Sequence, residues 1–202
     1  MRGYTLKSRR LKGAARIRGE ATVENEFDNF ALGSTRFCPG IPHSSSISIA
    51  SFFVLALTVE NSPLRWEILD AALHTDGQFL EDLAWDGSSA LRMNGLSVIL
   101  QASRKILAAI SEVLARQNVA ARDVQVFLLH QANQNLLVRV AKALGAAPEK
   151  VFSNVVRYGN PSPASMLIAA AEWATQNPPA GDIVFGAFEA GFHWGALLAR
   201  SR

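Results

Sequence analysis

The chain has 202 residues, of which 49% are apolar and 18% are charged. This length suits one domain, and the composition can bury a core, which excludes a chain that is disordered throughout. The longest apolar stretch, residues 47–59, has 13 residues, whereas a membrane-spanning helix needs about 20, so we expect no membrane span. The single cysteine, Cys38, excludes an internal disulfide and a cysteine-cluster zinc site, and it agrees with a cytoplasmic location.

The positive charge is confined to the N-terminal part of the chain. Residues 1–62 hold eight Lys or Arg against five acids, a net charge of +3, and residues 63–202 hold twelve of each sign. The basic segment has no helical stripe of charges and almost no aromatic residues between them, so we expect no nucleic-acid partner. We therefore divide the chain into an unassigned basic, loop-rich segment, residues 1–62, and a folded domain, residues 63–202.

The first half of the folded domain alternates strand and helix signals. Residues 66–73 fit a strand or two helical turns, and the turn signal HTDG that follows favours a strand. Apolar residues recur every three or four positions over residues 94–117, which predicts the clearest helix. Residues 124–129 (VQVFLL) have strand length and composition. These elements predict an α/β fold.

The second half continues the same alternation. Residues 133–144 return to helical spacing and end at Gly145, a residue suited to the C-cap. A segment of small residues, 163–175, predicts a helix that packs closely on a sheet, and the segment before it is expected to join a strand to this helix. Residues 182–188 and 194–199 predict two buried strands joined by a tight turn. We therefore expect a mixed sheet with packed helices.

Three segments carry polar residues at the ends of predicted elements: HQANQ at 130–134, NVVRYGNPSPAS at 154–165, and FEAGFHWG at 188–195. His130 would project from the end of a strand near the positive end of a helix dipole, which disfavours the imidazolium. Each segment also has a structural explanation. A histidine at a strand end often caps a helix or satisfies the core, an asparagine before proline is typical of turns, and the glycines at 191 and 195 fit a plain hairpin.

In combination and in this order, the three segments resemble β-ketoacyl-acyl-carrier-protein synthase III of the thiolase superfamily, whose chains carry HQAN, NxxxYGNTSAAS and GGGFTWGA. The resemblance covers roughly residues 66–202 and implies a thiolase-like half-domain, the C-terminal half of that fold. It implies an acyltransferase of fatty-acid biosynthesis that condenses an acyl-CoA with malonyl-ACP (acyl carrier protein) by decarboxylative Claisen chemistry. It implies neither a metal nor an organic cofactor.

The resemblance assigns His130 and Asn160 as the catalytic histidine and asparagine, which bind the thioester carbonyl of malonyl-ACP and stabilise the charge released by decarboxylation. Two donors near one developing oxyanion can supply roughly 3 kcal/mol each, so we expect the two side chains to converge within about 4–7 Å. The resemblance places a hairpin that forms an oxyanion hole at Ala190 and Gly191. The segment expected to contact the carrier protein consists of Gln131, Ala132, Asn133, Gln134 and Asn135.

Three departures from the family pattern leave alternatives open. Cys38 lies before Pro39-Gly40, unlike the family's nucleophile in an Ala-Cys-Ser-Gly context, so the chain lacks a recognisable nucleophile. Glu189 and Ala190 replace two hairpin glycines, and Asn135 replaces a basic residue. The chain could therefore be a truncated, inactive half-domain or partner subunit, or a non-elongating acyltransferase of the same superfamily. Its expected partners are the two acyl substrates and either a second copy or a complementary N-terminal half.

Overall fold

The structure is a computed structural model, and it describes residues 66–84, 91–162, 164–178 and 180–201. The boundary predicted at residue 63, the apolar stretch 47–59 and Cys38 lie outside these residues. Within them, no helix is long and apolar enough to cross a membrane.

In the part of the chain that the structure describes, four strands form the main sheet, in the order β1-β6-β5-β4. They are β1 (Trp66–Thr75), β4 (Val126–Leu129), β5 (Asp182–Glu189) and β6 (His193–Ser201). β4 runs parallel to β5, and the other neighbouring pairs are antiparallel. The predicted mixed sheet is therefore confirmed.

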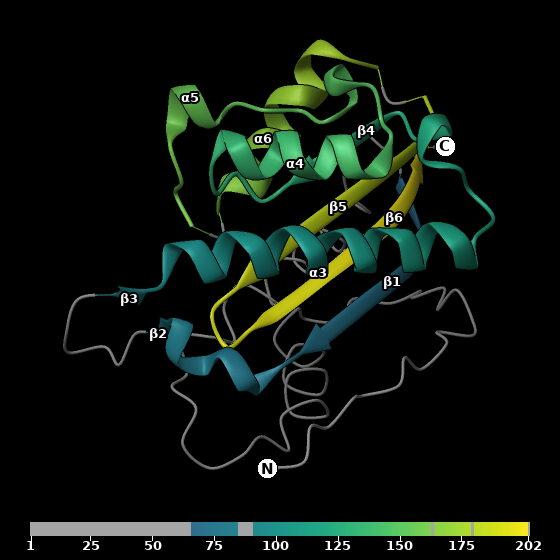
Figure 1. Cartoon of the computed structure of the whole chain (residues 1–202). Coiled ribbons are helices and arrows are strands. Elements are labelled where there is room, and N and C mark those ends of the chain that lie inside the picture. The colour runs from purple at the N-terminus through teal and green to yellow at the C-terminus, as the bar shows by residue number, and fades with distance from the viewer. Residues whose placement is uncertain (1–65, 85–90, 163, 179, 202) are drawn as a thin grey trace, which may run out of the picture.

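Helices cover both faces of the sheet (Figure 1). On one face lie α3 (Gly95–Arg116) and α4 (Gln134–Leu144), whose apolar residues join the larger core cluster. On the other face α6 (Ala164–Gln176) packs Met166, Ala170 and Trp173 into a second cluster with residues of β4, β5 and β6. Because α6 carries small residues, it can lie close to the strands, as its sequence predicts.

The helix ends follow the capping signals in the sequence. The Asn94 side chain accepts a hydrogen bond from the backbone of Ser97 at the start of α3, and Asn133 does the same for Leu136 at the start of α4. Gly145 ends α4 with φ of 62°, the left-handed conformation that glycine adopts without strain.

One predicted strand is wrong in extent. Before the GNPSP segment, the structure has only an isolated bridge between Val151 and Phe127, and the chain then turns into the short helix α5 (Val155–Tyr158). The remaining elements among the described residues are the two-residue strands β2 (Leu83–Ala84) and β3 (Arg92–Met93) and the 3-10 helices η2 (Gly77–Asp82), η3 (Ala121–Asp123) and η4 (Pro148–Lys150).

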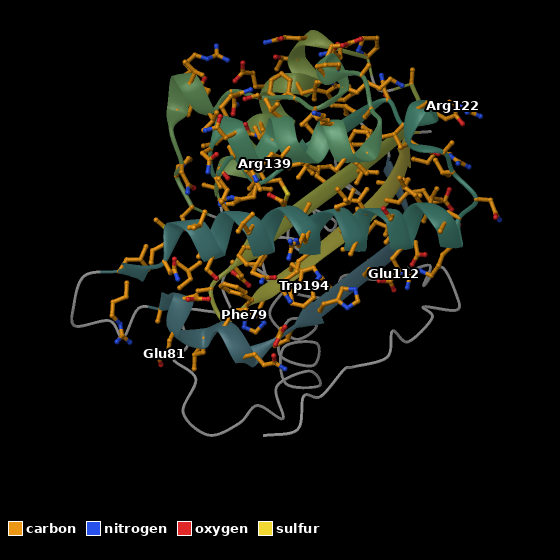
Figure 2. The ribbon with its side chains drawn as sticks, in the orientation of Figure 1. Phe79, Glu81, Glu112, Arg122, Arg139 and Trp194 are labelled. Atoms are coloured by element: carbon orange, nitrogen blue, oxygen red, sulfur yellow. The ribbon has the colours of Figure 1, made fainter. Side chains whose placement is uncertain are left out.

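Aromatic and charged side chains connect β6 with α3. Phe79, Trp194 and Glu112 lie along α3 in Figure 2. The ammonium of Lys105 lies 4.0 Å from the Trp194 ring centre and 2.8 Å from the carboxylate of Asp76. A half-buried cation over an aromatic face is stabilising. This contact holds the start of β6, and with it the β5–β6 hairpin, against the helix.

Candidate active site

His130 follows the last residue of β4. Its backbone N–H donates to the carbonyl of Gly186 on β5 at 2.8 Å, which fixes the residue at the edge of the sheet. The ring is half-buried, and Nδ1 lies 2.6 Å from the hydroxyl oxygen of Ser165. Burial lowers the pKa of His130 to about 4, because removing the ring from water disfavours the charged form. The imidazole is therefore neutral at neutral pH.

Ser165 joins the end of β4 to the start of α6. Its side chain is buried, and its oxygen accepts a hydrogen bond from the backbone N–H of Gln131 at 3.1 Å in addition to contacting His130. Sequence reasoning assigned no role to this serine, although it is the last residue of the YGNPSPAS segment. Its place in that segment was the available signal.

Asn160 lies in the loop between α5 and α6. The side chain is exposed, and its amide oxygen accepts from the backbone N–H of Ser162 at 3.0 Å, an Asx-type turn. The Nδ2 group supplies the donor that the predicted role requires. This loop leads from Asn160 into α6, whose second residue, Ser165, contacts His130. Convergence of Asn160 with His130 within 4–7 Å stays a prediction.

Gln131 is buried and holds three segments together. Its amide nitrogen donates to the carbonyls of Leu129 and Phe152, and its amide oxygen accepts from the backbone N–H of Asn154. These internal bonds leave the Gln131 side chain no part in contacting an external carrier protein. The rest of the predicted carrier-protein segment is more accessible: Ala132 is half-buried, and Asn133, Gln134 and Asn135 are exposed.

The next part of the chain is clamped to α6. Asn154 is buried, and its amide donates to the Glu172 carboxylate at 3.0 Å; Arg157 of α5 pairs with the same carboxylate. Gln131 and Glu172 therefore fix the segment that leads into the Asn160 loop.

Replacing Gln131 with leucine is expected to lower the free energy of unfolding by about 3 kcal/mol, because two carbonyls and one N–H would lose their buried partner. Gln134→Leu is the matched control, since Gln134 is exposed and its side chain accepts one hydrogen bond, from Ser153. We expect that change to cost below about 1 kcal/mol. Urea denaturation of both variants checks this, and equal costs would contradict the assigned role.

The β5–β6 hairpin closes the same end of the sheet. Gly191 is buried with φ of 117°, and Ala190 is half-buried. Phe192 exchanges both backbone hydrogen bonds with Asp76, at 2.9 and 3.2 Å, which ties the turn to the end of β1. The predicted oxyanion role of Ala190 and Gly191 stays a prediction.

His193 was not singled out from the sequence, where it stands in place of the family's threonine. The ring is buried, and Nδ1 lies 2.8 Å from the hydroxyl of Thr75. Burial lowers the pKa of His193 as well. A β-carbon on Gly191 would lie 2.4 Å from its Nε2, so the ring packs directly on the turn.

The described residues contain no group of three or more His, Cys, Asp or Glu side chains that could hold a metal ion.

Known proteins match this chain mainly over its C-terminal part, which contains the candidate site. The family described as the C-terminal part of 3-oxoacyl-[acyl-carrier-protein] synthase III matches residues 114–201. The β-ketoacyl-[acyl-carrier-protein] synthase III of Oleidesulfovibrio alaskensis is 33% identical over 152 residues, which cover 67% of this chain and 46% of the relative. The enzyme of that name from Gloeobacter violaceus is 42% identical over 114 residues, 55% of this chain and 35% of the relative.

Solved structures of related enzymes also resemble this chain. The 3-oxoacyl-[acyl-carrier-protein] synthase III of Aquifex aeolicus superposes with a TM-score of 0.65 at 32% identity, covering 69% of this chain and 46% of that one. The C-terminal type III polyketide synthase domain of Steely1 from Dictyostelium, at 16% identity and a TM-score of 0.56, covers 69% of this chain and 41% of that one. The second likeness concerns the fold alone.

The sheet, its helices and these neighbours define a thiolase-like α/β fold. Over its C-terminal region the chain is of the β-ketoacyl-acyl-carrier-protein synthase III type. It spans about half the length of the curated relatives it matches: 46% of the Oleidesulfovibrio enzyme and 54% of that from Chlorobium phaeobacteroides.

Proposed function

We propose that the chain supplies the C-terminal part of a cytoplasmic enzyme that condenses an acyl-CoA with malonyl-ACP in fatty-acid biosynthesis. The main support is His130, a neutral imidazole held at the end of β4 by burial and by Ser165. The loop that carries Asn160 follows α5 and leads into α6, the helix that carries Ser165.

In the proposed reaction, the bond between the malonyl carboxylate and the α-carbon breaks and carbon dioxide leaves. Its electron pair moves toward the thioester oxygen, where charge develops. The His130 imidazole and Nδ2 of Asn160 donate hydrogen bonds to that oxygen, and donors placed in this way are worth roughly 3 kcal/mol each. The resulting carbanion attacks an acyl group held as a cysteine thioester and displaces the thiolate.

The cysteine for the second step is the missing part. The chain's one cysteine, Cys38, stands outside the described residues and lacks the family context. We propose that a complementary N-terminal half, or a second copy of the chain, completes the site. Asn133, Gln134 and Asn135 are the exposed candidates for contact with the carrier protein.

Malonyl decarboxylation tests the first step without a nucleophile. The full chain is incubated with malonyl-ACP and the release of carbon dioxide is measured. We expect release above background, reduced about 100-fold in His130→Ala and in Asn160→Ala. Arg122→Ala is the control, because Arg122 is exposed in η3 and takes no part in the site, and it should leave release unchanged.

A folded chain that releases no more carbon dioxide than His130→Ala would contradict decarboxylation by this chain. That result would favour an inactive half-domain or partner subunit. Acyl transfer to an alcohol or amine without decarboxylation would instead favour a non-elongating acyltransferase, an alternative suggested by Glu189 and Ala190 in the hairpin.

A further inference from the structure

We infer that Ser165 is a positioning residue that fixes His130 in the tautomer with its proton on Nε2. The inference deepens the proposed function, because it says which nitrogen of His130 meets a substrate oxygen. It depends on which groups can donate hydrogen bonds to the buried Ser165 hydroxyl and which can accept one from it.

The Ser165 hydroxyl has one proton to donate and two lone pairs that accept. The backbone N–H of Gln131 occupies one lone pair, at 3.1 Å. The other hydrogen-bond partner of this oxygen is Nδ1 of His130, at 2.6 Å. The side chain is 1% exposed, so water is not a ready partner.

A buried hydroxyl whose proton finds no acceptor loses about 1–3 kcal/mol, so a conformation in which it donates is favoured. Among the residues that the structure describes, Nδ1 of His130 is the acceptor within reach of the Ser165 hydroxyl. The hydroxyl therefore donates to Nδ1, which must be unprotonated. A neutral imidazole carries one proton, so that proton is on Nε2.

This arrangement decides what His130 can do. Nε2–H donates a hydrogen bond to a carbonyl oxygen or an oxyanion, and it cannot accept a proton. Charging the ring would place a proton on Nδ1 against the serine proton, so Ser165 would have to rotate and leave its own hydrogen unpaired. Ser165 thus adds to burial in keeping the ring a neutral donor, which suits stabilisation of a thioester enolate and not general-base catalysis.

The test is an NMR experiment on the full chain with ¹⁵N-labelled histidine at pH 7, read from long-range couplings between ring nitrogens and ring protons. The signals of His130 are assigned by their loss in His130→Gln. We expect Nδ1 to have the shift of an unprotonated nitrogen and Nε2 that of a protonated one. The opposite assignment in the unaltered chain would overturn the inference, whether or not any variant folds.

Ser165→Ala should shift the ring toward a mixture of tautomers and raise the pKa of His130 by about one unit, since a hydrogen bond to the neutral form is lost. Ser165→Thr retains a hydroxyl and should restore the Nε2–H form. Ser103→Ala is the control: its hydroxyl donates to the carbonyl of Ile99 within α3, and the His130 signals should stay unchanged. An unchanged tautomer and pKa in Ser165→Ala would contradict the inference.

Because these spectra need no substrate, the inference can fail or hold independently of decarboxylation. Where decarboxylation is measurable, Ser165→Ala should lower kcat about tenfold with little change in KM, because the donor is disordered while substrate contacts remain. A purely structural role would lower the active fraction and leave the tautomer unaltered.

Discussion

Replacing Gly191 with alanine is expected to lower the free energy of unfolding by about 4 kcal/mol. Two costs add. The backbone has φ of 117°, which an L side chain rarely adopts. The new β-carbon would lie 2.4 Å from Nε2 of His193. That ring is buried and hydrogen-bonded to Thr75, so moving it aside would also cost free energy. A typical domain has only 5–15 kcal/mol in total, so the loss would be visible in urea denaturation.

Gly77→Ala is the matched control. Gly77 is exposed at the start of η2, a β-carbon there meets nothing within 4 Å, and its φ is unremarkable. We expect a change within about 1 kcal/mol. Introducing Gly191→Ala into a His193→Ala background should recover the part of the cost that comes from the ring and leave the backbone part. Equal costs at 191 and 77 would refute the account of this turn.

The parts of the fold that sequence predicts best are those with long, regular patterns. The apolar spacing over residues 94–117 anticipates α3, and the runs around 182–188 and 194–199 anticipate β5 and β6 to within two residues at each end. Asn133 and Gly145 set the limits of α4, because the Asn133 side chain and the Gly145 backbone N–H form hydrogen bonds with groups only three or four positions away. Local interactions of this kind are readable from the chain.

Elements that depend on contacts between residues distant in sequence cannot be predicted from local patterns. The strand expected before the GNPSP segment is reduced to one bridge at Val151, because Gln131 and Glu172 hold the chain at Asn154 and it turns into α5. A four-residue helix has no period to detect. The partners that decide its position lie 18 and 23 residues away.

In the candidate site, too, local motifs are predictable from the sequence and contacts between distant segments are not. Its motifs predict roles for His130 and Asn160, but nothing in their spacing shows that Ser165 and Gln131 are buried, since both are polar. The sequence also attributes the neutral ring of His130 to a helix dipole, whereas the structure gives burial as the cause. Burial depends on α6 folding over the end of β4, which a local pattern does not contain.

The free energy of unfolding is expected to fall by about 3 kcal/mol through His130 alone as the pH decreases from 6.5 to 4. In the unfolded chain this histidine binds a proton near its ordinary pKa of 6.5, and in the folded chain burial delays protonation until about pH 4. Between these values the unfolded state binds more protons, so stability rises with pH and is lost as pH falls. The difference of about 2.5 units, at 1.36 kcal/mol per unit, gives the magnitude.

His193 should add to the slope in the same direction, because its pKa is also lowered by burial. Urea denaturation at several pH values between 4 and 7 measures the slope. His130→Gln should reduce the slope of unfolding free energy against pH by the contribution of His130, whereas Arg139→Gln should leave the slope unchanged. Arg139 is exposed on α4, and its replacement by glutamine changes the net charge by one unit. If His130→Gln and the unaltered chain lose stability in parallel, the ring is protonated in the folded state near its ordinary pKa and cannot be the neutral donor that the proposed chemistry requires.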